Sequence, residues 1–314
     1  MSVDSATVAT STRDPGRSGD RAGKAVRTGS VAWMALPAIA MFTVFGAVPL
    51  AGVVVLSLTD WDGIGDITPA GLTNWVSVLQ DPVMWRSVVL TFGLMIASWL
   101  VQTPLSILIG AFTAGTQRYR TLLAVLYFVP LLLSAAAISV AYKALLDPNF
   151  GLAAGLGIPW LAQNWLGSQH LVLLVVVFVL SWEYIPFHSL IYQGGIRQIP
   201  ASLYEAAAID GAGRIRQFFT ITLPQLKYTI ITSSTLMVVG SLTSFDLIFV
   251  LTGGGPGNAT RILPIDMYVR GFQANQMGPA SVIAVLLVVT GLALALMLQR
   301  LGGRDRSASQ QEGM

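Results

Sequence analysis

The stretch PASVIAVLLVVTGLALALMLQ, residues 279–299, lies within a charge-free interval that extends from 271 to 299. A helix needs about 20 apolar residues to cross the hydrocarbon core of a bilayer, and a charge at its centre is costly. Further charge-free intervals lie at 28–59, 87–117, 121–142 and 148–182. A sixth apolar stretch, about 226–252, contains only Lys227 and Asp246 as charged residues. The sequence therefore predicts an all-α membrane protein with six transmembrane helices, at about 31–58, 86–114, 120–145, 169–192, 226–252 and 279–300.

The composition of the 314-residue chain excludes an ordinary water-soluble globule. Hydrophobic residues make up 54% of the chain and charged residues 11%, and the mean hydropathy is +0.68. Soluble domains carry about 25% charged residues. Because the chain has no cysteine, disulfides, zinc–thiolate sites, iron–sulfur clusters and thiol nucleophiles are also excluded.

The placement of the basic residues predicts the orientation in the membrane. Lys and Arg are enriched in the cytoplasmic loops of membrane proteins. With the N-terminus inside, the predicted outside segments hold only four of the 18 basic residues: Arg86, Lys143, Arg261 and Arg270. We therefore expect both termini to be cytoplasmic. Residues 1–30 are expected to be a disordered tail, 31–300 the six-helix domain, and 301–314 a second tail.

The segment between the fourth and fifth predicted helices, about 193–225, is long, cytoplasmic and rich in helix formers. Pro200 is a helix-start signal, and Ser202 precedes Glu205 by three residues, which is the spacing of a capping box. These residues predict a short helix at about 203–210.

The second half of this segment predicts a turn and another helix. The first helix should stop at Gly211 or Gly213, and a second should begin near Arg214. Pro224 marks the entry into the next membrane helix. Two short helices joined at a glycine elbow would form a compact knob facing the cytoplasm.

Several residues of the knob keep a fixed spacing: Glu205, Ala206, Ala207, Gly211, Ile221, Leu223 and Pro224. This pattern resembles the complete EAA loop of the permease subunits of bacterial ABC importers. Flanking stretches, among them LTGGGP at 251–256, are similar to the carbohydrate branch of that family and to its larger-type subunit. The resemblance covers about 31–300.

The resemblance implies how the knob works. In the family, the EAA loop rests in a cleft of a cytoplasmic ATPase, so that closure of the ATPase dimer on ATP moves the membrane helices. Glu205 would then meet a cationic side chain of the ATPase, and Gly211 would supply the elbow that a residue without a side chain allows. Ala206 and Ala207 would permit close helix approach, and the Leu-Pro pair would fix the angle into the membrane. Without the spacing match, a helical hairpin with no partner would be the simpler interpretation.

The same resemblance implies the partners and the solute class. It identifies a non-catalytic subunit of a binding-protein-dependent importer for a sugar or sugar-like solute, in the bacterial inner membrane. The expected partners are a second related permease, an ATPase dimer and an extracellular solute-binding protein, and no nucleic acid. The chain contains no Walker-type phosphate-binding sequence. It is therefore expected to bind no cofactor itself, with ATP and Mg²⁺ used by the partner ATPase.

Two acidic residues inside predicted membrane helices, Glu183 and Asp246, are candidates for the solute path, because intramembrane charges are expensive. Leu180, Tyr184 and Phe187 share a helix face near Glu183. Aromatic rings with hydroxyl and carboxylate groups suit sugars, whereas the alternative for this region is an ordinary aromatic core with a structural acid.

The fifth predicted helix carries a polar patch of Ser241, Thr243, Ser244, Phe245 and Asp246. By resemblance, this segment carries sugar contacts in the maltose member of the family, which has amides where this chain has Ser, Thr and Asp. Asp246 is expected either to contact the solute or to pair with a basic residue of the second permease.

Two other classes of function remain open from the residues alone. An ion-driven secondary transporter would use Glu183 or Asp246 as the coupling acid. A membrane enzyme would need clustered acids or histidines at one face of the bilayer, and the acids near the faces are scattered. His188 is interpreted as a hydrogen-bonded helix residue, and with only His170 besides it we expect no metal site. The glycine-rich 253–257 is interpreted as a turn.

Overall fold

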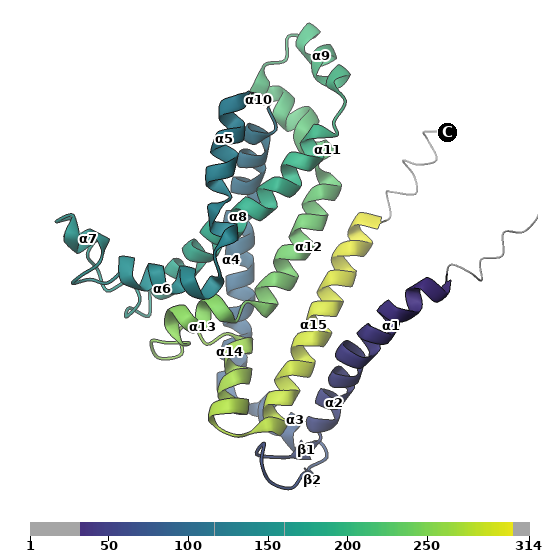
Figure 1. Cartoon of the computed structure of the whole chain (residues 1–314), viewed down its shortest axis with the longest axis vertical. Helices are drawn as coiled ribbons and strands as arrows, with labels where there is room; N and C mark the ends of the chain where they lie inside the picture. The colour runs from purple at the N-terminus through teal and green to yellow at the C-terminus, as the bar shows by residue number, and fades with distance from the viewer. Residues whose placement is uncertain (1–31, 116, 160, 304–314) are drawn as a thin grey trace, which may run out of the picture. The chain divides into compact units, whose positions relative to one another are not determined.

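The computed structural model describes residues 32–115, 117–159 and 161–303, and these are mostly helical (Figure 1). The described residues divide between residues 49 and 50 into two units. The predicted tail at 1–30 lies outside the described residues, as does all of the second predicted tail beyond Gly303.

The N-terminal apolar stretch forms one helical run that agrees with the first predicted span. It comprises η2 (Ala32–Ala35), α1 (Leu36–Phe42), a π-helical turn η3 (Thr43–Ala47) and α2 (Val48–Leu56). The part from Trp33 to Leu56 is 24 residues long with a hydropathy of 2.4, which is enough to cross a bilayer. An antiparallel pair of short strands, β1 (Thr59–Asp60) and β2 (Thr68–Pro69), and helix α3 (Thr73–Gln80) follow.

Two long helices, α4 (Pro82–Thr113) and α8 (Val172–Arg197), pack along each other. They approach so closely at Gly110 that an added Cβ would lie 2.9 Å from the Ser189 carbonyl oxygen. Gln193 Nε2 donates a hydrogen bond of 2.7 Å to the carbonyl of Thr113 across the same interface. Small residues and interhelical hydrogen bonds are the usual means of joining helices in a membrane, where the lipid is as apolar as the side chains.

The remaining long helices are α12 (Lys227–Thr243) and α15 (Met277–Gly303), which contact each other. Helix α14 (Leu263–Tyr268) and the π-helical turn η6 (Val269–Gln273) connect to α15. Near that end a buried cluster joins α3, α4, α14 and α15 through Val78, Met84, Leu263, Val282 and Ile283.

The predicted continuous helix at 120–145 is wrong. The segment forms α5 (Arg118–Tyr127), a 3₁₀ turn η4 (Val129–Leu132) and α6 (Ala135–Leu145). Pro130 lies in the 3₁₀ turn and has no N–H to continue the helical ladder. Ser134 then caps the next helix, because its hydroxyl accepts a hydrogen bond from the Ala137 N–H. A further short helix, α7 (Leu152–Gly155), follows α6.

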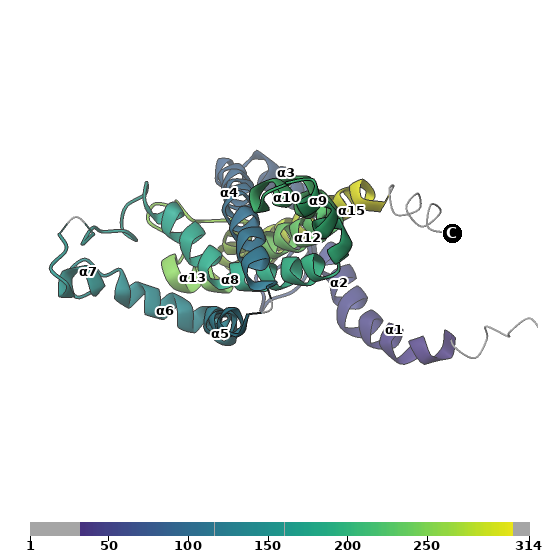
Figure 2. The ribbon, with the colours of Figure 1, turned by 90° about the horizontal axis from the view of Figure 1, so that it is seen from above.

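The predicted helix at 226–252 is also not continuous, since α12 and α13 (Asp246–Thr252) meet at an angle of 47°. The hydroxyls of Thr243 and Ser244 both donate to the Gly240 carbonyl, at 3.1 and 2.8 Å. Such bonds compete with the backbone ladder and favour a bend. Helix α13 lies beside α6 and α8 (Figure 2). It ends at Gly253, whose φ is 61°, and the glycine-rich residues after it form the predicted turn.

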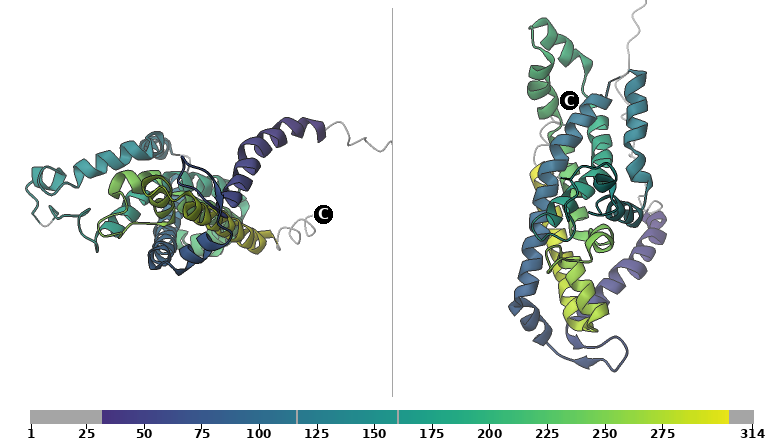
Figure 3. Two further views of the ribbon diagram at one scale, coloured as in Figure 1. Left: turned by 90° about the horizontal axis from the view of Figure 1, so that it is seen from below. Right: turned by 90° about the vertical axis from the view of Figure 1, so that its left-hand side faces the viewer.

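Within the described residues, four helices are long and apolar enough to cross a membrane, or five if the bent pair counts as one span. Six membrane crossings thus stay a prediction. After α8, the chain forms α9 (Ala201–Ile209), α10 (Arg214–Gln217), a π-helical turn η5 (Phe218–Thr222) and α11 (Leu223–Gln225). This segment stands at the end opposite the β1–β2 pair in two perpendicular views (Figures 1 and 3).

Candidate functional site

Residues 201–225, here called the knob, begin with the two predicted helices, α9 and α10, which are joined at a glycine elbow, and continue through η5 and α11. Helix α9 ends in a Schellman motif: the N–H of Ala212 donates to the Ala207 carbonyl at 2.8 Å, and that of Gly211 donates to the Ala208 carbonyl at 3.1 Å. Gly211 has a φ of 75°, which a residue with a Cβ adopts only at a cost. The second helix begins at Arg214, as predicted.

The predicted capping box is wrong. Helix α9 begins at Ala201, so Ser202 is its second residue, and the N-cap is Pro200 with no side-chain cap. An N-cap residue must have non-helical backbone angles. Ser202 and Glu205 therefore both stand in the body of the helix.

The residues of the predicted EAA pattern lie partly on the surface of the knob. Glu205, Ala206, Gly211 and Pro224 are exposed, and Ala207, Ile221 and Leu223 are half-buried. Sequence analysis missed the apolar side chains that surround them. Four of these are exposed: Leu203 (39%), Phe219 (60%), Ile215 (78%) and Ile209 (87%). These residues were detectable in the sequence as apolar side chains that recur in a segment between two predicted membrane helices.

A cavity of about 270 Å³ lies between α4, α8 and α12. It brings together five residues predicted for the solute path: Leu180, Tyr184, Phe187, Ser241 and Ser244. The lining therefore combines aromatic rings from α8 with hydroxyls from the end of α12. The volume is just below the range of about 300–1,000 Å³ that is usual for complete ligand pockets.

Three polar residues of this lining were missing from the sequence-based set. Ser98 and Gln102 come from α4, and His188 comes from α8. The first two were detectable as polar residues inside the charge-free interval 87–117, but only the packing of α4 on α8 places them here. His188 is confirmed as a hydrogen-bonded helix residue, since its Nδ1 lies 2.9 Å from Ser233 Oγ.

The other predicted path residues lie elsewhere. Thr243 and Phe245 line a separate cavity of about 530 Å³ between α12, α14 and α15. Asp246 is the first residue of α13 and is exposed. Glu183 is only 8% exposed, and its Oε2 atom has no hydrogen-bond partner among the described residues.

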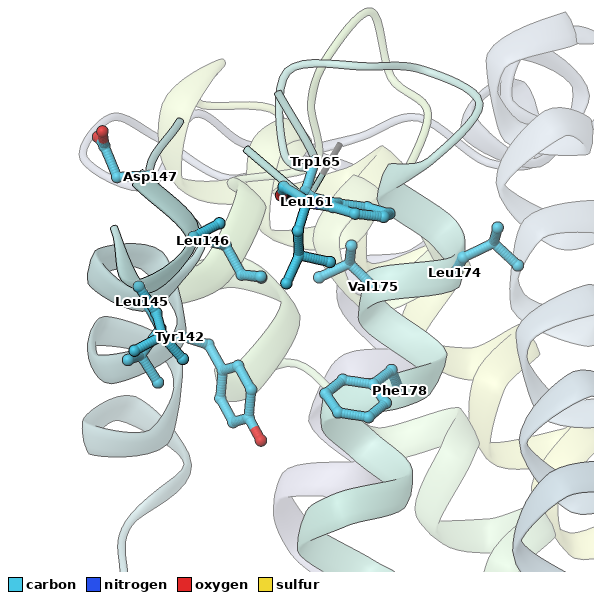
Figure 4. A pocket seen from close by; sticks show the side chains of 11 residues that line it. Tyr142, Leu145, Leu146, Asp147, Leu161, Trp165, Leu174, Val175 and Phe178 are labelled. Atoms are coloured by element: carbon cyan, nitrogen blue, oxygen red, sulfur yellow. Dashed lines mark hydrogen bonds between the residues drawn. The ribbon is translucent and has the colours of Figure 1, made fainter. Parts of the chain in front are cut away.

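A third cavity, of about 560 Å³, is lined by α6, α7, the segment between α7 and α8, and the first turns of α8. Figure 4 shows that Tyr142 and Phe178 face each other across it, and their ring centroids are 6.0 Å apart. Trp165 also contributes to the lining, but its Nε1 already donates to the Leu161 carbonyl at 2.7 Å. This cavity therefore offers mainly apolar surface and little hydrogen-bonding capacity for a sugar.

Four charged side chains form a network at the end of the unit that carries the strands. Asp266 is fully buried, and it is 2.7 Å from Arg261 Nη2 and 3.1 Å from Arg270 Nε. Arg270 also pairs with Asp81, the N-cap of α4. Burial alone would raise the pKa of Asp81, but hydrogen bonds from Arg270 and from the Val83 N–H outweigh it, so this pKa lies below its ordinary value. The network fixes the beginning of α4 to the turn before α15.

A family model and several known proteins match most of this chain. Residues 102–306 match the family model of the binding-protein-dependent transport system inner membrane component. The chain belongs to this family. The probable ABC transporter permease protein YurN of Bacillus subtilis is 32% identical over 83% of this chain and 92% of its own length. The trehalose/maltose transport system permease protein MalF of Thermococcus litoralis is 30% identical over 86% and 92%.

Solved structures share the fold. The structure of a bacterial ABC transporter involved in the import of the acidic polysaccharide alginate aligns with a TM-score of 0.76 at 22% identity. The alignment covers 87% of this chain and 94% of that chain.

Membership of the family decides between the classes of function that the residues left open. Proteins of this family are multi-pass inner-membrane permease subunits without catalytic activity of their own. The predicted permease is therefore confirmed, and neither a membrane enzyme nor an ion-driven secondary transporter is supported. Among the described residues, no three His, Cys, Asp or Glu side chains come together as a candidate metal site.

Proposed function

We propose that this chain forms one half of the solute pathway of an ABC importer for a sugar or sugar-like solute, and that the knob couples it to a cytoplasmic ATPase. ATP binding would close the ATPase dimer, the knob would move with it, and the membrane helices would open the pathway alternately to the two sides.

The observation that carries this proposal is the exposed knob with its motif spacing. Glu205 and Ala206 face outward from α9, and the exposed apolar side chains Ile209 and Ile215 flank the elbow. Apolar side chains exposed away from the membrane helices indicate a surface that is covered in an assembly. A cleft of the ATPase that accepts these apolar side chains and pairs with Glu205 would cover it.

The assignment of a sugar rests on the relatives and on the cavity. Relatives include the multiple sugar-binding transport system permease MsmF of Streptococcus mutans, 31% identical over 77% of this chain, and the arabinooligosaccharide permease AraP of Bacillus subtilis. In this chain, Tyr184 and Phe187 supply ring surface, and Gln102, Ser98 and Ser241 supply hydrogen-bonding groups. Because the volume of this cavity, about 270 Å³, lies below the usual range for a ligand pocket, we infer that a second permease completes it. Asp246, exposed on α13, is available to the solute or to that second permease, and Glu183, Thr243 and Phe245 are assigned to the same path.

The proposed assembly has four kinds of component. This permease pairs with a second, related permease, and the two bind an ATPase dimer that uses ATP and Mg²⁺. A solute-binding protein delivers the sugar from outside. One structural neighbour was determined in complex with an alginate pentasaccharide-bound periplasmic protein, which supports the last component.

The proposed orientation places the knob in the cytoplasm, with both termini on that side. The knob end carries Arg214, Arg216 and the nearby Arg197 and Lys227, in accord with the enrichment of basic residues in cytoplasmic loops. The opposite end, with β1 and β2, would receive the solute-binding protein.

The experiment that tests the coupling role is a charge reversal with a matched control. The tagged chain is purified from its native membrane in mild detergent, and the co-purifying proteins are identified by mass spectrometry. We expect the wild-type chain to retain an ATPase and a second permease, and Glu205→Lys to lose the ATPase. The control Asp66→Lys makes the same charge reversal at an exposed residue between β1 and β2 and should retain both. Full retention of the ATPase and of ATP-driven uptake by Glu205→Lys would refute the coupling role.

A further inference from the structure

The knob contains a hydrogen bond between its two ends. Tyr204 Oη, in α9, lies 2.9 Å from Thr222 Oγ1, and either hydroxyl can be the donor. Thr222 is the last residue of η5 and is 5% exposed. It directly precedes α11 and α12, so the bond joins α9 to the entry of a long membrane helix.

Little else holds α9 in place. None of its residues is buried, and its covalent connection to α10 passes through Gly211, at a φ of 75°. The two hydrogen bonds of the Schellman motif set the resting geometry of this elbow, but a glycine has no Cβ to resist a change of its backbone angles, so the elbow yields more readily than a packed helix. A push on α9 that travelled along the backbone towards α10 and α12 would be absorbed there, whereas residues 198–200 connect α9 only to α8.

The bond provides a second route that does not pass through the elbow. It closes a ring from residue 204 to residue 222, and Gln217 Nε2 donates to the Ala212 carbonyl at 2.9 Å inside that ring. The first of these bonds ties α9 to η5, and the second ties α10 to the residue after the elbow. The two bonds together restrict rotation of α9 about the elbow.

We propose that Tyr204 and Thr222 are positioning residues, whose hydrogen bond transmits the displacement of α9 to α12. This inference rests on the proposed coupling role of the knob. It assigns the rigidity of the knob to one hydroxyl pair, and it leaves contact with the ATPase to the exposed side chains. The ring of Tyr204 is needed because it carries the hydroxyl across the gap between α9 and η5.

The test compares variants that remove one hydroxyl each: Tyr204→Phe, Thr222→Val and the double variant. Thr220→Val is the matched control, because Thr220 lies on the same π-helical turn and its hydroxyl bonds only to the Arg216 carbonyl within that stretch. Thr222→Ser keeps the hydroxyl and serves as the rescue variant. All variants are studied in the complete complex, purified with its ATPase.

The readout follows motion of the membrane part directly, so no transported solute has to be known. The chain has no cysteine, so Ser241→Cys introduces a single thiol at the cavity of α4, α8 and α12. The rate at which a water-soluble maleimide labels that thiol is measured with and without Mg-ATP. Equal ATPase recovery and equal ATP hydrolysis are checked for each variant.

We expect the ATP-induced change in labelling rate to fall about two- to tenfold in Tyr204→Phe and Thr222→Val, the range that corresponds to one net hydrogen bond. The double variant should be no worse than either single variant, and Thr220→Val and Thr222→Ser should behave as the wild type. A normal response of Tyr204→Phe would overturn the inference, as would failure of Thr222→Ser or an equal loss in Thr220→Val. Loss of the ATPase from Tyr204→Phe would also overturn it, because the hydroxyl would then be a docking contact.

The inference and the coupling role fail differently. A wild-type complex in which Mg-ATP causes no change in labelling, or a Glu205→Lys variant that responds normally, contradicts the coupling role itself. A normal response in Tyr204→Phe beside a lost response in Glu205→Lys contradicts only the inference.

Discussion

The buried carboxylate of Asp266 provides a stringent test of how the strand end of the bundle is held together. Asp266→Asn keeps the shape of the side chain and removes its charge. In the native protein, both carboxylate oxygens are used: Arg261 donates to Oδ1 at 2.9 Å through Nε, and Arg270 donates to Oδ2 at 3.1 Å. The substitution leaves two guanidinium groups facing a neutral amide.

The magnitude follows from the burial of the partners. Breaking a buried ion pair by removing one partner costs about 3–5 kcal/mol. Here the loss is smaller, because Arg270 keeps its pair with Asp81 and the Arg261 side chain is 19% exposed. We therefore expect a loss of about 2–3 kcal/mol in the free energy of unfolding, which is about a 30- to 150-fold change in the unfolding equilibrium.

The assay is reversible denaturant unfolding of the purified chain in mild detergent, followed by tryptophan fluorescence. The control is Asp66→Asn, the same chemical change at an exposed residue between β1 and β2, which should cost less than about 0.5 kcal/mol. The double variant Asp266→Asn/Arg270→Gln should cost less than the sum of its parts, because the two residues share one interaction.

A loss for Asp266→Asn no larger than that of Asp66→Asn would refute the reasoning. The Coulombic attraction in the network would then only balance the cost of burying the four charges. Additive single variants would contradict the direct pairing of Asp266 with Arg270.

Three further predictions follow from the packing, the charges and the elbow. Gly110→Ala should destabilise the chain by about 1–3 kcal/mol, because the new Cβ meets the backbone of α8; Gly93→Ala, which has no atom within 4 Å of the new Cβ, should be neutral or stabilising in the same unfolding assay. The lowered pKa of Asp81 means that its pair with Arg270 contributes stability at neutral pH, which is lost as the pH falls through that pKa. Between pH 7 and pH 3, the free energy of unfolding should therefore fall less in Asp81→Asn than in the wild type. An equal fall in both proteins would contradict the pairing. Gly211→Ala has open space around its Cβ but a φ of 75°, so it should cost about 1–2 kcal/mol of local strain and reduce ATP-driven uptake, whereas a variant with normal uptake would show that the elbow tolerates a side chain.

The sequence by itself determined the features that depend on local composition and spacing. Charge-free intervals located the N-terminal helical run and the long helices α4 and α15, because the cost of burying a charge in lipid acts on each helix separately. They did not delimit α8, which carries Glu183 in its middle. The glycine elbow and the second helix of the knob were also predictable, since Gly211 and Arg214 act within one turn of chain. The spacing of Glu205 to Pro224 identified the family that residues 102–306 match.

The breaks within two predicted helices were harder to predict, although their causes are local. Pro130 and Ser134 end one helix and begin another, and Thr243 and Ser244 turn their hydroxyls onto the backbone of α12. One or two Pro, Ser or Thr residues hardly change the mean hydropathy of a stretch of about 20 residues. A prediction from hydropathy therefore reads through the helix breaks that these residues cause.

Tertiary structure alone decided which side chains share a cavity and which close the knob. Ser98 and Gln102 meet Tyr184 because α4 packs on α8, and the bend after α12 separates Phe245 from Ser244 into different cavities. Tyr204 meets Thr222 across 18 residues of sequence. The charge and polarity of a side chain are fixed by the residue type, but its partners depend on the crossing and bending of helices distant in the chain, which no single local pattern encodes.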